Sequence, residues 1–302
     1  MRNMVMLFVI IGACLYGQRF PDRWIALNPL LDSSRRIEPG KLGWMHSLVG
    51  WGEFGGYLSG DREHAWIQRL GTLIELVRIG ERSSLAFASE IEFIANPDND
   101  IRFNPRAVFW QEGFLFTHQV GKGFWQLGYY HRCKHDVDNL DIGRQRSLIY
   151  GSIVGKYLFP IAVADFTGGA LARGDLYTIR LDDRTPPSDN GSNPDLERLL
   201  ATLGGSIHLR RGLADPWLGL YASAWTSANF YSGRPNANPN AAAAPLIRLH
   251  GGVAAGIAIT GTAHFRIGIS YEYLADTGIN PIPEASALLA VTIAVVNPAA
   301  MW

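Results

Sequence analysis

Residues 263–274 read AHFRIGISYEYL, and this stretch alternates with a period of two residues. Its odd-numbered positions are mostly apolar or aromatic and its even-numbered positions mostly polar: Phe265, Ile267, Ile269, Tyr271 and Tyr273 against His264, Arg266, Ser270 and Glu272. Successive residues of a strand point to opposite faces, so the pattern predicts a strand with one apolar face. Membrane-spanning strands need about nine to eleven residues, whereas strands of soluble proteins usually have about five or six.

The same alternation recurs along the chain, for example in 198–210, where Leu199, Leu203 and Ile207 share the apolar face. Twelve strands are expected: 47–58, 65–79, 83–95, 105–118, 122–134, 146–158, 170–181, 197–211, 215–230, 245–260, 262–275 and 285–296. Ten or fourteen strands remain alternatives, because 170–181 alternates poorly. The stretch 159–169 before it is longer than a tight turn and is compatible with a short helix.

The links between these strands alternate in length. Short links lie at 80–82, 119–121, 212–214 and 261, whereas links such as 182–195 and 231–244 are long and rich in Asn, Pro and Gly or Ala. Short periplasmic turns alternating with long outer loops are typical of outer-membrane barrels. The sequence therefore predicts an all-β, antiparallel, up-and-down transmembrane β-barrel in a bacterial outer membrane, with both termini in the periplasm.

The first 17 residues resemble an export signal. Met4–Ala13 is an apolar run of ten residues, too short for a spanning helix of about 20 residues but suited to a signal peptide. We expect a signal peptide at 1–17, a periplasmic N-terminal segment at 18–46 and the barrel at 47–302. Cys14 follows a sequence similar to a lipoprotein box and is a candidate for lipidation.

Composition excludes several functional classes. Lys+Arg and Asp+Glu are equal at 27 each, so no net charge favours nucleic acid. Only Cys133 follows the predicted signal, which excludes an intramolecular disulfide framework or a zinc cluster of cysteines. No motif indicates a cofactor. No mature segment has 18 consecutive apolar residues, which argues against a helical inner-membrane protein.

The period-two phase predicts which charged side chains face the lumen. On the lipid face a mid-membrane Arg or Lys is destabilising by roughly 2–4 kcal/mol, so charges within the strands should point inward: Arg69, Glu75, Glu90, Glu92, Arg132, Lys134, Arg210, Arg248, Arg266 and Glu272. Mixed signs allow two arrangements. The charges either pair and close a narrow barrel, or line a small polar channel.

Residues 124–139, FWQLGYYHRCKHDVDN, combine several reactive side chains. The phase places His131, Cys133 and His135 on the outward side. These residues fit an interfacial aromatic girdle, and a metal site is less consistent because His131 and His135 would lie about 13 Å apart in a strand. A third interpretation is an acyl-hydrolase site, in which His131 activates the Cys133 thiol and Gln145, Asp136 or Asn139 orients the imidazole.

This segment resembles outer-membrane phospholipase A and the lipid A deacylases, whose His-x-Ser pair faces the outer leaflet. The chain has Cys133 where those families have serine. The stretches PRAVFWQEGFLF, FWQLGYYHRCKHD and RSLIYGSIVGKYL also resemble an uncharacterised family of bacterial outer-membrane barrels of unknown function, and this similarity implies location and fold alone.

We therefore expect an outer-membrane barrel that is a narrow pore or a structural or interaction protein, and not an enzyme. The alternative is an outer-leaflet lipid acyl hydrolase that uses His131, Cys133 and Gln145. Expected partners are outer-membrane lipids, lipopolysaccharide and, during biogenesis, the barrel-assembly machinery. The sequence leaves the oligomeric state open, and predicts no metal or cofactor and no nucleic-acid partner.

Overall fold

The computed structural model describes residues 27–31, 37–45, 47–59, 63–95, 105–136, 147–182, 199–232, 247–275 and 285–297. Nearly all of them lie in strands. The elements are η1 (Pro29–Leu31), β1 (Leu42–Trp44), β2 (Leu48–Ser59), β3 (Trp66–Ile79), β4 (Ser83–Ala95), β5 (Pro105–Val120), β6 (Gly123–Asp136), β7 (Ser147–Val163), β8 (Phe166–Asp182), β9 (Leu199–Gly212), β10 (Leu218–Tyr231), β11 (Ile247–Thr260), β12 (His264–Leu274) and β13 (Ser286–Val296).

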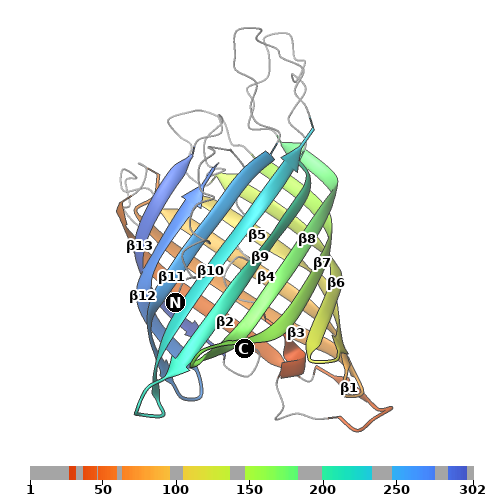
Figure 1. The fold of residues 1–302 in the computed structure, drawn as a ribbon. Helices are drawn as coiled ribbons and strands as arrows, with labels where there is room; N and C mark the ends of the chain where they lie inside the picture. Colours follow the sequence, from red (N-terminus) through yellow and green to blue (C-terminus); the bar gives the residue numbers. More distant parts are fainter. Residues whose placement is uncertain are drawn as a thin grey trace, which may run out of the picture.

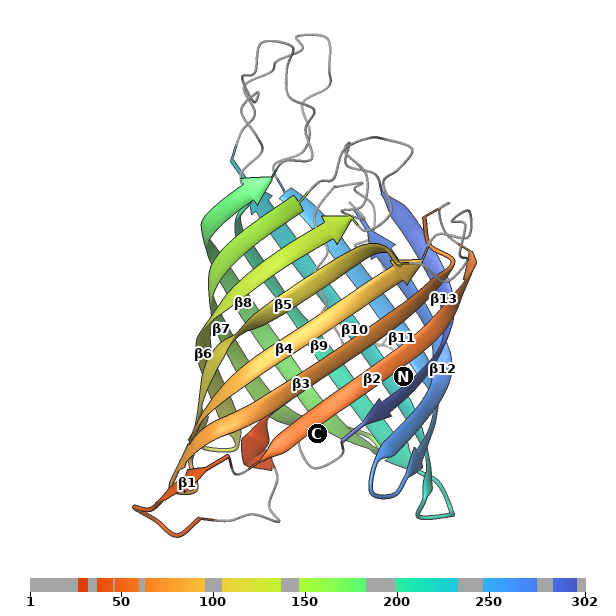
Figure 2. The ribbon, with the colours of Figure 1, turned by 180° about the vertical axis from the view of Figure 1, so that it is seen from behind.

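The strands close into a barrel. Each of β2 to β13 pairs antiparallel with its neighbours in the chain, and β13 pairs with β2 to complete the ring. Within the described ranges the sheet has thirteen strands. Twelve of them, β2 to β13, form this ring, and β1 is paired only with β3. Figures 1 and 2 show the strands tilted around the barrel axis. The predicted all-β, antiparallel, twelve-stranded barrel is confirmed.

The link between β7 and β8 differs from the prediction. The sequence suggested a long link or short helix at 159–169, but β7 continues to Val163 and β8 begins at Phe166. Only Ala164 and Asp165 form the turn, and Ala164 has a positive φ of 52°. The strands are not recognisable from the sequence here because proline and glycine are unusual inside strands. Yet Pro160 pairs with Gly169, and Gly168 pairs with Ile161, inside this hairpin.

A short strand that the sequence did not predict extends the sheet beside β3. β1 pairs Leu42 with Ile79 and Trp44 with Val77. Met45 follows it with a positive φ of 47°, a backbone conformation uncommon for residues other than glycine. The Trp44 side chain is 71% exposed, so this strand presents an aromatic ring on the outer surface of the barrel.

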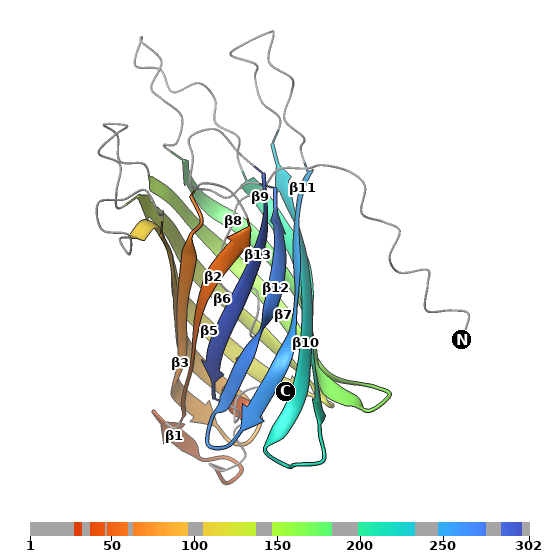
Figure 3. The ribbon, with the colours of Figure 1, turned by 90° about the vertical axis from the view of Figure 1, so that its left-hand side faces the viewer.

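The two ends of the barrel are unlike each other. The turns between β3 and β4, β5 and β6, β7 and β8, β9 and β10, and β11 and β12 are short and lie at the lower end in Figure 3. The other links are mostly longer in sequence. This asymmetry identifies the lower end as the periplasmic one.

The outer wall is apolar along the height of the strands. Large exposed apolar side chains occur on nearly every barrel strand, among them Phe54, Leu70, Phe114, Leu127, Ile153, Leu176, Leu203, Val253, Ile269 and Ile293. A continuous apolar surface of this kind is rare on soluble monomers and suits contact with lipid. No helix among the described residues is long and apolar enough to cross a membrane.

The inside of the barrel is packed with side chains. One apolar cluster joins Leu27 to β2, β3, β4, β5, β6, β7 and β13. The backbone around η1 is held there by two hydrogen bonds: Gln126 Nε2 donates to the Leu27 carbonyl at 3.1 Å, and Arg78 Nη2 donates to the Pro29 carbonyl at 2.7 Å. Residues 27–31 thus lie inside the lower end of the barrel.

Near the opposite end, an aromatic cluster joins Tyr150, Tyr177 and Tyr231 to Leu199. Leu199 is completely buried there, although the sequence pattern placed it on the outer face with Leu203, which is 56% exposed. The prediction for Leu199 is wrong because the register of β10 against β9 shifts between Phe230 and Tyr231. A shift of one residue reverses the face to which a side chain points.

Candidate functional site

One charged network inside the barrel is centred on Arg69. Its guanidinium binds Glu92 at 2.8 Å, Glu53 at 3.0 Å and Glu272 at 3.0 Å. Glu92 and Glu53 come from β4 and β2, the strands on either side of β3, whereas Glu272 comes from β12, which is not paired with β3. The Arg69 side chain is only 2% exposed, so its ion pairs are shielded from solvent.

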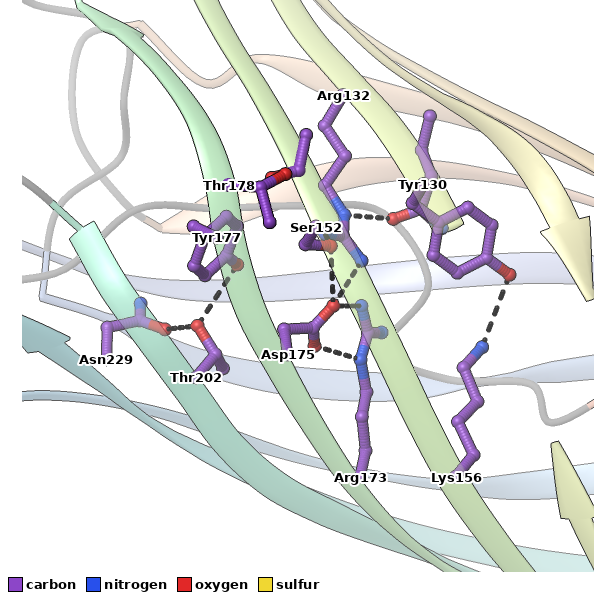
Figure 4. Close-up of polar contacts among 12 residues, drawn as sticks. Tyr130, Arg132, Ser152, Lys156, Arg173, Asp175, Tyr177, Thr178, Thr202 and Asn229 are labelled. Atoms are coloured by element: carbon purple, nitrogen blue, oxygen red, sulfur yellow. Dashed lines mark hydrogen bonds and ion pairs between the residues drawn. The ribbon is translucent and has the colours of Figure 1, made fainter. Parts of the chain in front are cut away.

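A second network lies on the wall formed by β5 to β8 (Figure 4). Arg132 Nη2 binds the Asp175 carboxylate at 2.7 Å, and Arg173 Nε binds its other oxygen at 2.5 Å. Ser152 Oγ donates to the same carboxylate at 3.1 Å and also accepts from Arg132. The Arg132 guanidinium lies 5.0 Å from the centre of the Tyr130 ring, an arrangement that gains cation–π attraction.

The structure buries most of the charged residues for which the sequence predicts a lumen position. Eight of the ten are buried: Arg69, Glu75, Glu90, Glu92, Arg132, Lys134, Arg248 and Glu272. Arg266 is half-buried and Arg210 is exposed. Arg210 differs because it lies two residues from the periplasmic end of β9 at Gly212, where the lumen meets solvent.

On the outer wall, β6 carries the reactive residues singled out in the sequence. His131 and Cys133 follow Trp125, Leu127 and Tyr129 at alternate positions, and those three side chains are 53%, 61% and 40% exposed. His131 is half-buried and His135 is exposed. Cys133 is opposite Trp110 on β5 and Ile149 on β7 and is only 7% exposed, so its thiol is largely covered within this face.

Tyr129, beside His131, is fixed by its neighbours on β7 and β8. Its hydroxyl is 3.1 Å from Thr178 Oγ1. Its ring covers Gly151, where any side chain would collide with the phenol oxygen. Gly151 is also directly opposite His131 in the β6–β7 register. Because Gly151 has no side chain, the ring of Tyr129 can lie over it, directly beside His131.

Sequence reasoning missed Glu112, a residue of the outward face. Glu112 on β5 is directly opposite His131 on β6, and opposite residues of antiparallel strands have Cβ atoms about 4.5–5.5 Å apart. It is half-buried and alternates with Trp110 and Phe114, which are 41% and 54% exposed. The signal was present in FWQEGFLF, where Glu112 shares the phase of three aromatic residues.

The remaining candidates from the sequence lie outside the described residues. These are Gln145, Asn139, Cys14 and the side chain of Asp136. Within the described part of the chain, no group of three or more His, Cys, Asp or Glu side chains is arranged to hold a metal ion.

The fold and surface define the class of protein. A closed antiparallel barrel satisfies its backbone hydrogen bonds internally, as a membrane-spanning sheet must. Its wall is apolar outside and its charges are mostly buried inside. With short turns at one end, this is a β-barrel protein of the bacterial outer membrane.

Comparisons with known proteins find similar solved structures but no family. No family model matches the chain, and no curated protein does. Solved structures similar to it include LpxR from Salmonella typhimurium, with TM-score 0.43, 10% identity and coverage of 82% of this chain and 99% of that one. The outer membrane phospholipase of Salmonella typhi gives TM-score 0.44 and 10% identity, covering 90% of this chain and 98% of its own.

Proposed function

We propose that this protein is a closed, non-conducting barrel that has a structural or interaction role in the outer membrane. The observation that supports the proposal is the apolar cluster around Leu27, which lies inside the barrel and contacts seven of its strands. Close-packed apolar side chains leave no continuous path for hydrated ions. Elsewhere in the lumen, Arg69 pairs with Glu92 and Arg132 pairs with Asp175.

Single-channel recording tests this proposal. The full mature chain is refolded, its barrel is verified by a heat-dependent shift in gel mobility, and it is inserted into planar bilayers. We expect no conductance above that of the protein-free bilayer. Steady ohmic steps from correctly folded protein would contradict closure and favour the narrow pore.

A second candidate function, lipid acyl hydrolysis, is favoured by the position of Glu112 opposite His131. In this reaction His131 takes the Cys133 thiol proton as Sγ attacks an ester carbonyl. A thioester forms, the ester C–O bond breaks and the departing alkoxide receives the proton from His131. Water then hydrolyses the thioester to a free fatty acid and restores the thiol. Glu112 or Gln145 would orient the imidazole.

Lipid mass spectrometry tests this second candidate. Cells that produce the wild type, His131→Ala or Cys133→Ser protein at equal levels are compared. Hydrolysis predicts that deacylated lipids accumulate with the wild type and that the His131→Ala variant loses them. Cys133→Ser should lose most of the activity. Identical lipid profiles in all three strains would rule the enzyme out.

A further inference from the structure

Glu112 is unusual because of where it lies. Among the described barrel residues it is the only carboxylate that shares the outward phase of the apolar wall. It is seven residues from the first residue of β5, Pro105, and eight from the last, Val120. The middle of such a strand lies within the hydrocarbon, where ionisable side chains are costly and commonly functional.

The imidazole of His131, next to Glu112, gives this surface a hydrogen-bond donor beside an acceptor, so two copies of it can complement each other. The carboxyl group of Glu112 accepts hydrogen bonds and the ring of His131 donates them. The two residues are side by side on β5 and β6. A two-fold axis parallel to the membrane normal brings Glu112 opposite His131 of the partner subunit and repeats the pair on the other side of the axis. Isologous interfaces require this complementarity.

The apolar surroundings of the pair suit the same contact. Phe114 and Leu127 protrude from β5 and β6, at 54% and 61% exposure. On β7, the space above Gly155 is open, with nothing within 4 Å of where a Cβ would lie. Protruding side chains that pack against small residues, together with a few hydrogen bonds, are what drive association within a bilayer.

We propose that the β5–β6 face is a homodimer interface within the membrane, in which Glu112 hydrogen-bonds to His131 of the partner subunit across a two-fold axis. This inference goes beyond the closed barrel proposed above and does not depend on it. Dimerisation covers a polar pair that otherwise faces acyl chains, and it gives the pair a role that needs neither a metal ion nor catalysis.

Sedimentation of the folded protein in density-matched detergent measures the association. We expect the wild type to form dimers and Glu112→Leu to raise the dissociation constant about tenfold or more, since each dimer loses two hydrogen bonds within the membrane. Glu112→Leu should fold at least as well as the wild type, because leucine is favoured on the lipid face. Ser89→Ala, opposite Glu112 on β4, is the matched control and should dimerise normally.

Exchange of the two residues gives the sharper result. Glu112→His alone and His131→Glu alone should both weaken the dimer, because each places like groups across the axis. The double variant restores unlike pairs and should recover the dimer. Cys133→Ser should dimerise like the wild type, which separates this proposal from hydrolysis. A monomeric wild type, whether or not it retains lipid, or undiminished dimers of Glu112→Leu would overturn the proposal.

Discussion

Arg69 shows how a single buried side chain can connect much of this barrel. One guanidinium bonds carboxylates from β2, β4 and β12. Arginine suits this position because its five N–H donors form a rigid planar fork that can bind several carboxylates. Three carboxylates without the cation would be left in an interior that solvates them poorly, so the network depends on Arg69 more than on any one glutamate.

The dependence of three carboxylates on one guanidinium predicts a large effect of Arg69→Met on stability. Removing one partner of a buried ion pair typically lowers the free energy of unfolding by about 3–5 kcal/mol. The change is measured from urea unfolding in lipid vesicles, followed by tryptophan fluorescence. Adding Glu92→Gln to Arg69→Met should recover part of the loss, because one uncompensated charge is removed.

The control for Arg69 is an ion pair in solvent. Lys41 and Glu38 are 2.6 Å apart, with side chains 69% and 75% exposed, and such pairs contribute about 0–1 kcal/mol. Lys41→Met should therefore change the unfolding midpoint little. Equal effects of Arg69→Met and Lys41→Met would show that water reaches the Arg69 network.

At the scale of elements, the sequence predicts strands wherever alternation is unbroken. β4 and β12 match their predicted positions closely, because their apolar residues alternate with Glu90 and Glu92 or with Arg266 and Glu272. The β7–β8 hairpin was not predictable. There the pairing partner supplies what local sequence lacks: Pro160 is paired with Gly169 inside a long antiparallel ladder, and tertiary pairing overrides local propensity.

The register of neighbouring strands carries information that one strand lacks. Alternation alone places Glu112 on a face but cannot say which residue lies beside it. Only the β5–β6 register brings it opposite His131. The reversal of Leu199 has the same origin, since the irregularity at Phe230 is a property of two strands. Candidate sites made by cross-strand neighbours are therefore predictable only in part.

At the scale of the whole molecule, the arrangement of charge follows from the membrane. An apolar solvent outside forces ionisable groups inward, where Arg69 and Arg132 pair with carboxylates. The sequence predicts the first consequence from phase. It leaves a channel and a closed barrel as alternatives, because the position of Leu27 among strands far away in the chain, which supports the proposed closure, has no local signal.

The proposed closure of the lumen predicts that small aqueous reagents reach the turns but not the inside of the barrel. Ala88 on β4 and Ala290 on β13 are 3% and 2% exposed, whereas Lys122 is exposed in the β5–β6 turn. In a Cys133→Ser background, each is replaced by cysteine and treated with a charged methanethiosulfonate in folded vesicles. Lys122→Cys should react rapidly, and Ala88→Cys and Ala290→Cys should react only after unfolding in urea, since a close-packed interior excludes the reagent.

Leu127→Cys, on the lipid face at 61% exposure, distinguishes shielding by lipid from shielding by protein because detergent exchange should increase its labelling alone. Labelling of the two inward cysteines within about tenfold of the turn site would mean that water fills the barrel, because reaction then follows access to solvent and no longer the packing around Leu27.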